Sequence, residues 1–316
     1  MANNQDTKKS VPELNRLKAL ARLLTLEDLK ALEAGKPVLI SGYSPVMPQD
    51  LEKIDQACPG WRKRLESREE GKDNVVYLPA WPELVRGVPN GFLRSALFGI
   101  VAKGKRRYLE NERIDAIDGI EVYYTGQKLD QMDLDVYENL LHLARQQALG
   151  SCCRVTSYRL LKLLGKNDDG RNRKLLQLCI LRLKATAVVI KCGRYSYIGS
   201  LLDEGYKDEE TQEWVIVLNP KIKALFAPDQ YTQINWEVRR KLGPLAKWLH
   251  GFYASHAKPY PIRVETLHRL CGSETKDLFH FRAKLRAALQ TLQAVTGWTC
   301  TIDENDLVHI NKTPKK

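Results

Sequence analysis

The chain has 316 residues, a length that predicts two domains of about 150 residues each. Fifty lysines and arginines against 38 aspartates and glutamates leave a formal net charge of +12, and this excess favours a polyanionic partner, either a nucleic acid or an acidic membrane surface. The basic residues are spread evenly, which favours a nucleic acid over a membrane surface. No apolar run approaches the ~18 residues of a membrane span, and no apolar signal segment is present. We therefore expect a cytoplasmic nucleic-acid-binding protein with no membrane partner.

Residues 1–75 are expected to be a helical, partly disordered extension or linker. Residues 1–9 are polar and are expected to be disordered. Leucines at helical spacing predict a helix over 12–34, and a second amphipathic segment follows over 49–57. Residues 61–73 are mostly charged, as in a linker or a solvated helix. We expect the leucines of this extension to contact a partner or to pack on the main body.

Residues 76–232 are expected to form a first DNA-reading domain. A β-branched and aromatic run at 120–124 predicts a strand, and apolar residues at helical spacing predict a helix over 134–144. Between residues 154 and 185, a short helix ends at Gly165 and a longer helix follows it. This pair is typical of a helix-turn-helix.

The longer helix of this pair begins with a basic run. Its first turn consists of Arg171, Asn172, Arg173 and Lys174, and Arg182 lies near its end. Positive residues at a helix N-terminus oppose the helix dipole, so a phosphate or a base edge would explain their presence. A tolerated cluster of surface charges is the alternative explanation.

Residues 233–316 are expected to form a second domain with the same order of elements. A helix over 236–256 precedes a short helix that ends at Gly272, and Ser273 is an acceptable N-cap for the longer helix that follows. The longer helix has one apolar face. The basic residues on or beside its other face are Lys276, His280, Arg282, Lys284 and Arg286.

A predicted hairpin follows each pair of helices. The first lies at 188–198, with a further strand at 214–218, and the second lies at 298–310. Each helix pair alone could be a plain αα-hairpin with a solvated basic face. The repetition favours an α+β fold, mainly helical, in which two tandem winged-helix domains follow the N-terminal extension.

Several short motifs follow one another along the two predicted domains. In the first domain they are Arg94-Ser95-Ala96-Leu97-Phe98, Tyr124-Thr125-Gly126, Gly170-Arg171, Arg182-Leu183, Ala185-Thr186-Ala187 and Leu225-Phe226-Ala227. In the second they are Arg240-Lys241-Leu242, Ser255-His256, Pro259-Tyr260-Pro261, Glu265-Thr266, Cys271-Gly272-Ser273, Arg282 and Asp306-Leu307-Val308-His309. On these motifs, the chain from residue 89 onward resembles the TrfA-type initiators of plasmid replication, relatives of the iteron-binding Rep proteins.

This resemblance implies a non-enzymatic protein that binds repeated iterons in double-stranded DNA at a plasmid origin. It implies that the protein helps to open an A·T-rich segment, contacts the single-stranded DNA formed there, and brings in the host initiator and the replicative helicase. It also implies a homodimer in equilibrium with a monomer, the dimer acting as an autorepressor. By position, it places Arg171 and Arg182 in the first recognition helix and Arg282 in the second.

The N-terminal region departs from the family pattern. The family carries a peptide that binds the sliding clamp just before its Trp-Pro pair. Here the corresponding stretch reads Asp73-Asn74-Val75-Val76-Tyr77-Leu78, so the resemblance gives no support for the clamp as a partner.

Two other functions compete with the initiator. A winged-helix transcriptional repressor without a replication role would share every DNA-binding feature. A nicking relaxase would need a His-x-His metal cluster and a nucleophilic tyrosine, and the six histidines include no such pair. The seven cysteines show no C-x-x-C spacing, so no zinc site, disulfide framework or other cofactor is predicted.

Overall fold

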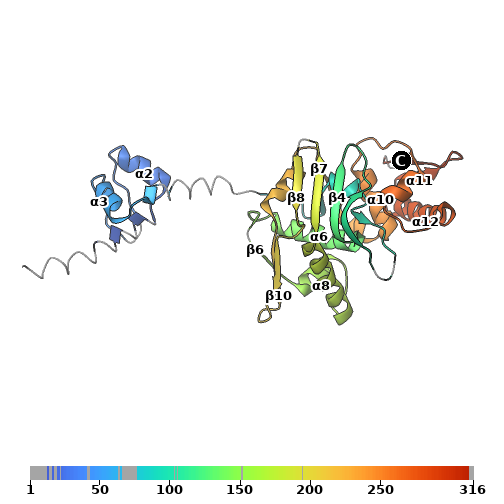
Figure 1. The fold of residues 1–316 in the computed structure, drawn as a ribbon, viewed down its shortest axis with the longest axis horizontal. Coiled ribbons are helices and arrows are strands. Elements are labelled where there is room, and N and C mark those ends of the chain that lie inside the picture. The colour runs from blue at the N-terminus through green and yellow to red at the C-terminus, as the bar shows by residue number, and fades with distance from the viewer. Residues whose placement is uncertain are drawn as a thin grey trace, which may run out of the picture. The chain divides into compact units, whose positions relative to one another are not determined.

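The computed structural model describes residues 13, 16–17, 20–21, 23–40, 43–62, 65, 77–102, 104, 106–150, 152–193 and 195–312. The chain divides into two compact units, residues 1–75 and 76–316 (Figure 1). Residues 1–9, for which we expect disorder, lie outside the described residues, as do residues 73–76 of the stretch compared with the clamp-binding peptide.

The first unit has an apolar core of its own. Its helices include α2 (Leu26–Glu33) and α3 (Asp50–Ala57), and a single β-bridge joins Val38 to Val46. The helix expected over 12–34 is interrupted at residues 24–25, because Thr25 begins α2 with a reciprocal capping box to Asp28. The side chains buried in this core are Leu17, Leu20, Leu24, Leu29, Leu32, Val38, Val46, Leu51, Ile54, Trp61 and Leu65.

The expectation that the leucines of the first unit contact a partner or the main body is therefore wrong for the buried ones, which pack on one another. Spacing alone could not show this. It marks an apolar face but not what that face packs against.

The second unit is mixed α+β. Up to residue 235, its elements in chain order are β1 (Val85–Pro89), α5 (Asn90–Leu93), β2 (Phe98–Gly99), β3 (Tyr108–Ile114), β4 (Glu121–Gln127), β5 (Leu129–Asp130), α6 (Gln131–Ala144), β6 (Cys152–Thr156), α7 (Ser157–Leu163), α8 (Gly170–Lys184), β7 (Ala187–Cys192), β8 (Tyr195–Gly199), β9 (Glu204–Lys207), β10 (Glu213–Val217), the 3₁₀ helix η1 (Pro220–Phe226) and β11 (Tyr231–Asn235). One apolar core runs through these elements, from Leu78 to Trp236.

The remaining elements surround a second apolar core. They are α9 (Trp236–Arg240), α10 (Pro244–Ala254), β12 (Ile262–Arg263), α11 (Val264–Leu270), α12 (Leu278–Thr296), β13 (Thr299–Ile302) and β14 (Leu307–Asn311). This core runs from Leu242 to Ile310. The predicted domain boundary between residues 232 and 233 stays a prediction.

Both helix pairs lie beside a three-stranded antiparallel sheet of the same design. In each sheet, the strand before the helix pair is an edge strand, since the orders are β6-β10-β9 and β12-β14-β13. In each sheet, the strand that precedes the helix pair pairs with the last strand of the hairpin that follows it. The repetition expected from the sequence therefore extends to the strand order.

The hairpin expected at 188–198 forms as β7 and β8, but it does not belong to the sheet of the first helix pair. Because β7 pairs with β4, this hairpin completes the four-stranded sheet β3-β4-β7-β8, whose strands β4, β7 and β8 run side by side in Figure 1. The hairpin that accompanies α7 and α8 is β9–β10, at 204–217. Our assignment of the first wing to 188–198 is thus corrected.

Helix α6 is the central element of the second unit. Asp130 begins it with a capping box to Asp133, and the helix packs on both α8 and β1. It is buried on nearly all sides and carries charged as well as apolar residues into the interior. Such charges need partners, because an isolated ion in the interior is strongly unfavourable.

We predict that the buried imidazole of His250 makes the fold sensitive to acid. Burial, and secondarily the nearby Arg239 charge, lower the pKa of His250 to about 4. Since this value lies below the ordinary pKa of ~6.5, the unfolded chain binds the proton more readily. The contribution of His250 is full above pH 6.5 and is lost as the pH falls toward 4, which amounts to about 2 kcal/mol between pH 7 and pH 5.

Urea unfolding at pH 7 and pH 5 measures this loss. The variant His250→Phe keeps an aromatic ring beside Trp298, whose ring centroid lies 5.5 Å from that of His250, but the variant cannot titrate. Its stability should fall less between the two pH values than that of the unmodified protein. An equal fall in both proteins would contradict the assignment.

Candidate nucleic-acid interface

The first candidate surface is a hollow of about 410 Å³ between the first turns of α7 and α8 and the β9–β10 hairpin. Tyr158 comes from α7, Lys174 and Gln177 come from α8, and Lys207 comes from β9. None of the residues that line this hollow is acidic. It therefore offers cations and amide groups to a polyanion, as a protein that reads DNA does.

The start of α8 is fixed by the turn that precedes it. Asp169 caps the helix by accepting the Asn172 backbone N–H at 2.8 Å, and the Asn172 amide donates to the Asn167 carbonyl at 3.0 Å. Arg173 makes two bonds to the Asp168 carboxylate, of 2.6 and 2.7 Å. Asn172 and Arg173 thus have partners within the turn.

The other basic side chains of this turn are differently placed. Arg171 and Lys174 are exposed, and no ion pair within the described residues holds either of them. Of the four residues expected from the sequence, these two are the ones whose charge is free to meet a phosphate or a base.

Arg182 lies in α8, as its position in the sequence indicates, but its side chain does not face outward. Its guanidinium faces inward and bonds Asp133 of α6 at 2.7 and 3.0 Å, and its side chain is only 10% exposed. Burial raises the pKa of the Asp133 carboxyl, Asp130 raises it further, and Arg182 opposes both effects. A contact between Arg182 and DNA would leave this buried carboxylate without its best partner, so Arg182 is better explained as an internal tie between α8 and α6.

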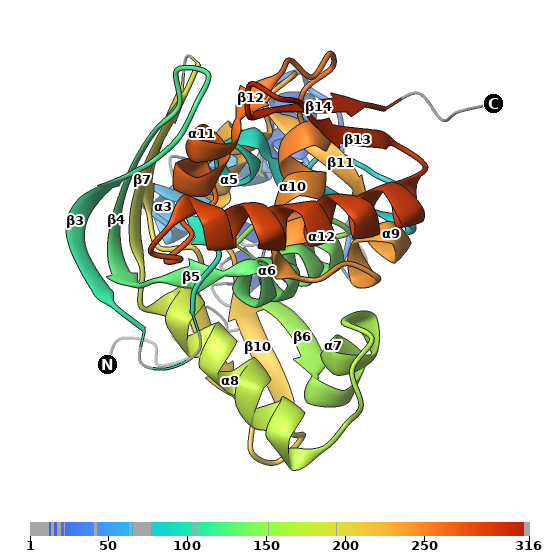
Figure 2. The same ribbon diagram turned by 90° about the vertical axis from the view of Figure 1, so that its right-hand side faces the viewer.

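The second candidate surface is formed by α12 and the turn before it. This helix crosses the face turned to the viewer in Figure 2, with α7 and α8 below it. Gly272 ends the preceding helix with a φ of +62°, as expected of a left-handed glycine. The N-cap is Asp277 and not Ser273, because the Asp277 carboxylate accepts the His280 backbone N–H at 2.8 Å.

The basic residues predicted around α12 are gathered on its exposed side. Lys276 is exposed in the turn that precedes the helix, and the His280 ring is 70% exposed, with its Nδ1 lying 2.6 Å from an Asp277 carboxylate oxygen. Lys284 reaches back to the Thr275 hydroxyl at 3.1 Å, and Arg286 is exposed. The structure thus brings Lys276, His280, Lys284 and Arg286 onto one surface.

Arg282 lies at the edge of this surface and is paired. It bonds both carboxylate oxygens of Asp306, at 2.8 and 2.7 Å, and this bond holds the pKa of Asp306 below its ordinary value. Asp306 lies in the β13–β14 turn with a φ of +62°. The pair therefore fastens the second hairpin to the long helix.

Acidic residues mark the tips of both hairpins. The first tip carries Asp208, Glu209 and Glu210, and the second carries Asp303, Glu304 and Asp306. Phosphates repel carboxylates, so these tips do not suit a DNA backbone. In the first hairpin, the suitable group is Lys207, although it is paired with Glu209 at 3.1 Å.

Several residues of these surfaces were missed from the sequence. Gln177 follows Lys174 at helical spacing and could have been found from that spacing. Lys207 could not, because the first hairpin had been assigned elsewhere. Phe279 is 75% exposed next to the buried Phe281, and its position outside the apolar periodicity of α12 was the available signal.

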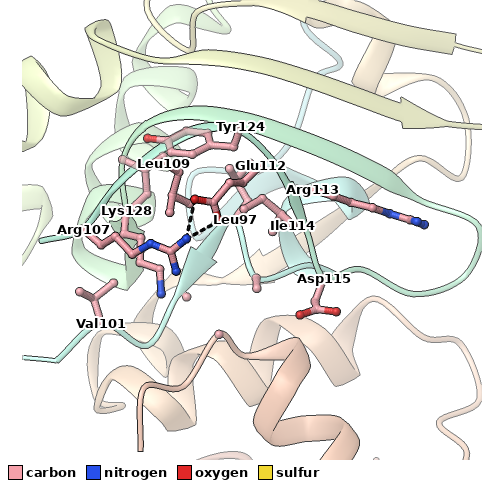
Figure 3. Close-up of a pocket in the computed structure, with 14 residues that line it drawn as sticks. Leu97, Val101, Arg107, Leu109, Glu112, Arg113, Ile114, Asp115, Tyr124 and Lys128 are labelled. Atoms are coloured by element: carbon pink, nitrogen blue, oxygen red, sulfur yellow. Dashed lines mark hydrogen bonds and ion pairs between the residues drawn. The ribbon is translucent and has the colours of Figure 1, made fainter.

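A second hollow, of about 150 Å³, lies between β3 and the glycine turn after α11 (Figure 3). Two of its cations are paired: Arg107 bonds Glu112 within the hollow, and Lys128 bonds Glu274 at 2.9 Å. This hollow is smaller than the one beside α8, two of its three cations are already neutralised, and the third, Arg113, points away from it in Figure 3. It is the weaker candidate for a polyanion.

Among the described residues, no group of three or more His, Cys, Asp or Glu side chains could hold a metal ion. None of the described helices is long and apolar enough to span a membrane.

Comparisons with known proteins identify the family. The model of the TrfA protein family matches residues 67–312, which include both helix pairs and their sheets. The plasmid replication initiator protein TrfA of Escherichia coli is 31% identical to this chain over 243 residues. The chain belongs to the TrfA family.

That match covers 73% of this chain and 63% of the relative, so the chain spans less than two thirds of the relative's length. Among solved structures, domains 2 and 3 of RctB share the fold, with a TM-score of 0.50 at 14% identity over 71% of this chain and 96% of that one. The Pi initiator protein in complex with iteron DNA matches with a TM-score of 0.43 at 9% identity, over 56% of this chain and 89% of that one.

We predict that Arg182 and Arg171 respond oppositely to substitution. Arg182→Ala leaves Asp133 with Arg106, at 3.2 Å, as its cation, and should lower the free energy of unfolding by about 3 kcal/mol. Because Arg182 faces inward, the folded variant should still bind DNA. Arg171→Ala is the matched control and should leave the stability unchanged while it weakens DNA binding.

Thermal or urea unfolding, together with gel-shift titration below the unfolding transition, separates the two effects. A stable Arg182→Ala protein that no longer binds DNA would contradict this assignment.

Proposed function

We propose that this protein is a plasmid replication initiator that binds iteron repeats through two winged-helix domains, at 76–232 and 233–316. The observation that supports this best is the repeated arrangement in the second unit. Each half places a long helix with exposed basic residues beside a three-stranded sheet of the same strand order. Membership of the TrfA family supports the assignment to replication.

In the proposed complex, α8 and α12 enter successive major grooves of one repeat. Side chains of the first long helix, Arg171, Lys174 and Gln177, face the groove together with Lys207 of the wing. Lysine and arginine suit guanine edges and phosphates, whereas glutamine suits adenine. Each good base contact contributes about 1 to 3 kcal/mol of discrimination against the wrong base.

The wings have a different role from the one usual for a basic wing. Their acidic tips lie away from the phosphates in the proposed complex, so the wings contribute mainly by positioning residues of the helices. In the second domain, Asp306 holds Arg282 at the edge of α12. In the first, the indole N–H of Trp214 on β10 donates to the Ser157 hydroxyl at 3.1 Å, which positions the start of α7.

The proposal extends to the later steps of initiation. After iteron binding, the protein assists the opening of an A·T-rich segment, contacts the exposed single strand, and recruits the host initiator and the replicative helicase. A homodimer in equilibrium with the monomer represses the protein's own promoter. These steps rest on the family alone, and residues 1–75 have no role assigned in them.

The DNA-binding part of the proposal predicts two kinds of variant at the second domain. Lys276→Ala and His280→Ala should reduce the preference for an origin repeat over a scrambled duplex by about fivefold or more, because each removes a base contact. Arg282→Ala frees the wing from α12 and should weaken binding to both duplexes by the same factor. Gel-shift titrations against the two duplexes measure both factors.

If all three variants changed the preference alike, the division into base-reading and holding residues would be wrong. The rival function, a transcriptional repressor without a replication role, predicts the same gel shifts. An assay of plasmid replication that depends on the cognate origin distinguishes the two, since only an initiator supports replication when supplied in trans.

A further inference from the structure

The second long helix exposes a large apolar side chain where contact with DNA is expected. Phe279 is 75% exposed, whereas Phe281, two residues later, is 1% exposed and belongs to the core. Burying a phenylalanine side chain is favourable, and the fold does not use this gain at Phe279. A single exposed apolar residue is not unusual on a protein surface, so its surroundings decide what it means.

The surroundings of Phe279 are apolar along the helix and cationic at the sides. Ala283 and Ala287 are exposed one and two turns further along the same face of α12. The cations around this face are Lys276, His280, Lys284 and Arg286. The nearby acids are the N-cap Asp277, Glu274, which is paired with Lys128, and Asp306, which is paired with Arg282. A partner must therefore combine negative charge with a local apolar group.

The Phe279 ring also has a defined neighbour. It meets the His280 ring edge to face, with centroids 5.6 Å apart and an interplanar angle of 89°. His280 is in turn held by the Asp277 carboxylate at 2.6 Å. The aromatic pair is thus connected to the helix cap, which limits the freedom that Phe279 would lose on binding.

The two long helices differ at matched positions. The buried residues Leu176, Ile180 and Leu183 of α8 have the same spacing as Leu285, Leu289 and Leu292 of α12. Superposed on this spacing, α8 places Lys174 and Gln177 where α12 places Ala283 and Arg286. The first helix is polar at a position where the second is small and apolar, so the two helices suit different base edges.

We propose that Phe279, with Ala283 beside it, contacts the C5-methyl groups of thymine in the major groove and makes α12 specific for thymine. In the major groove, the thymine methyl is the apolar group of a base pair, and it lies between rows of phosphates that the surrounding cations match. This inference rests on the proposed DNA-binding function and adds to it the kind of base that the second domain reads.

Deoxyuridine tests the contact, because it pairs like thymidine but lacks the C5-methyl group. The whole 316-residue chain first selects a preferred duplex from a random pool. Each thymine of that duplex is then replaced in turn by deoxyuridine, and affinities are measured by gel shift for the unmodified protein and for Phe279→Ala. Loss of one contacted methyl group should weaken binding of the unmodified protein about fourfold, from ~0.8 kcal/mol per methyl or methylene group.

At the thymines that Phe279 contacts, Phe279→Ala should bind the original duplex more weakly and should show no further loss with deoxyuridine. Leu84→Ala removes another exposed apolar side chain, 67% exposed and distant in sequence from α12, and should keep the full fourfold loss. Because Phe279 is exposed, the variant should fold normally, and its thermal unfolding checks this.

The outcomes separate this inference from the function on which it rests. If the protein selects a duplex but Phe279→Ala keeps every deoxyuridine penalty, or the unmodified protein shows none, the thymine contact is overturned and DNA binding stands. Unchanged affinity of Phe279→Ala for every duplex would overturn the contact too. If no duplex sequence is preferred, both the contact and the proposed function fail.

Discussion

The second unit depends on the charges that α6 carries into the interior. Asp133 accepts from Arg182 of α8, and Asp135 accepts from Arg239 of α9 at 2.8 Å and is also paired with Lys247 of α10. Glu138 lies 3.0 Å from the Arg239 guanidinium, and burial raises its pKa to about 7, with Arg239 opposing the rise. Buried ion pairs contribute little net stability, but they strongly disfavour any arrangement in which one partner is lost. One helix thereby holds elements from both halves of the unit.

A neighbouring cluster extends this constraint along α6. Arg86 is 2% exposed, lies over the Trp236 ring at 4.9 Å, and bonds Asn139 at 3.1 Å. His142 completes the cluster: its Nδ1 lies 3.1 Å from both the Trp81 indole nitrogen and an Arg86 nitrogen, and its Nε2 lies 2.9 Å from Glu83. The tautomer protonated at Nε2 satisfies all three contacts. Burial lowers the pKa of His142, which fits a neutral ring in that role.

The features that could be predicted from the sequence are those that depend on residues close together in the chain. Both helix pairs follow from apolar spacing, and their stops at Gly165 and Gly272 follow from the left-handed conformation that glycine tolerates, with φ of +67° and +62°. The family resemblance was also readable, because its motifs are short and occur in order. The exposed cluster around α12 followed from the helix period.

The features that could not be predicted depend on partners far along the chain. Four short strands, β7 to β10, lie between α8 and η1, and nothing local distinguishes the pair that joins β4 from the pair that joins β6. In the sequence, Arg182 does not differ from other basic residues near the end of a long helix. Only the fold shows that Asp133, 49 residues earlier, lies beside it. The core of the first unit was missed for the same reason, since an apolar face does not reveal what covers it.

The ties that α6 makes have a consequence for geometry as well as for stability. Arg182 ties α8 to α6, Arg239 and Lys247 tie α9 and α10 to it, and α12 packs on α10, so α6 connects the two long helices. One inserted base pair turns the far half of a DNA site by about 34°, since a helical turn takes ~10.5 base pairs. A rigid reader cannot follow that turn without losing contacts, so in the proposed complex the phase between the two half-sites is part of the recognised sequence.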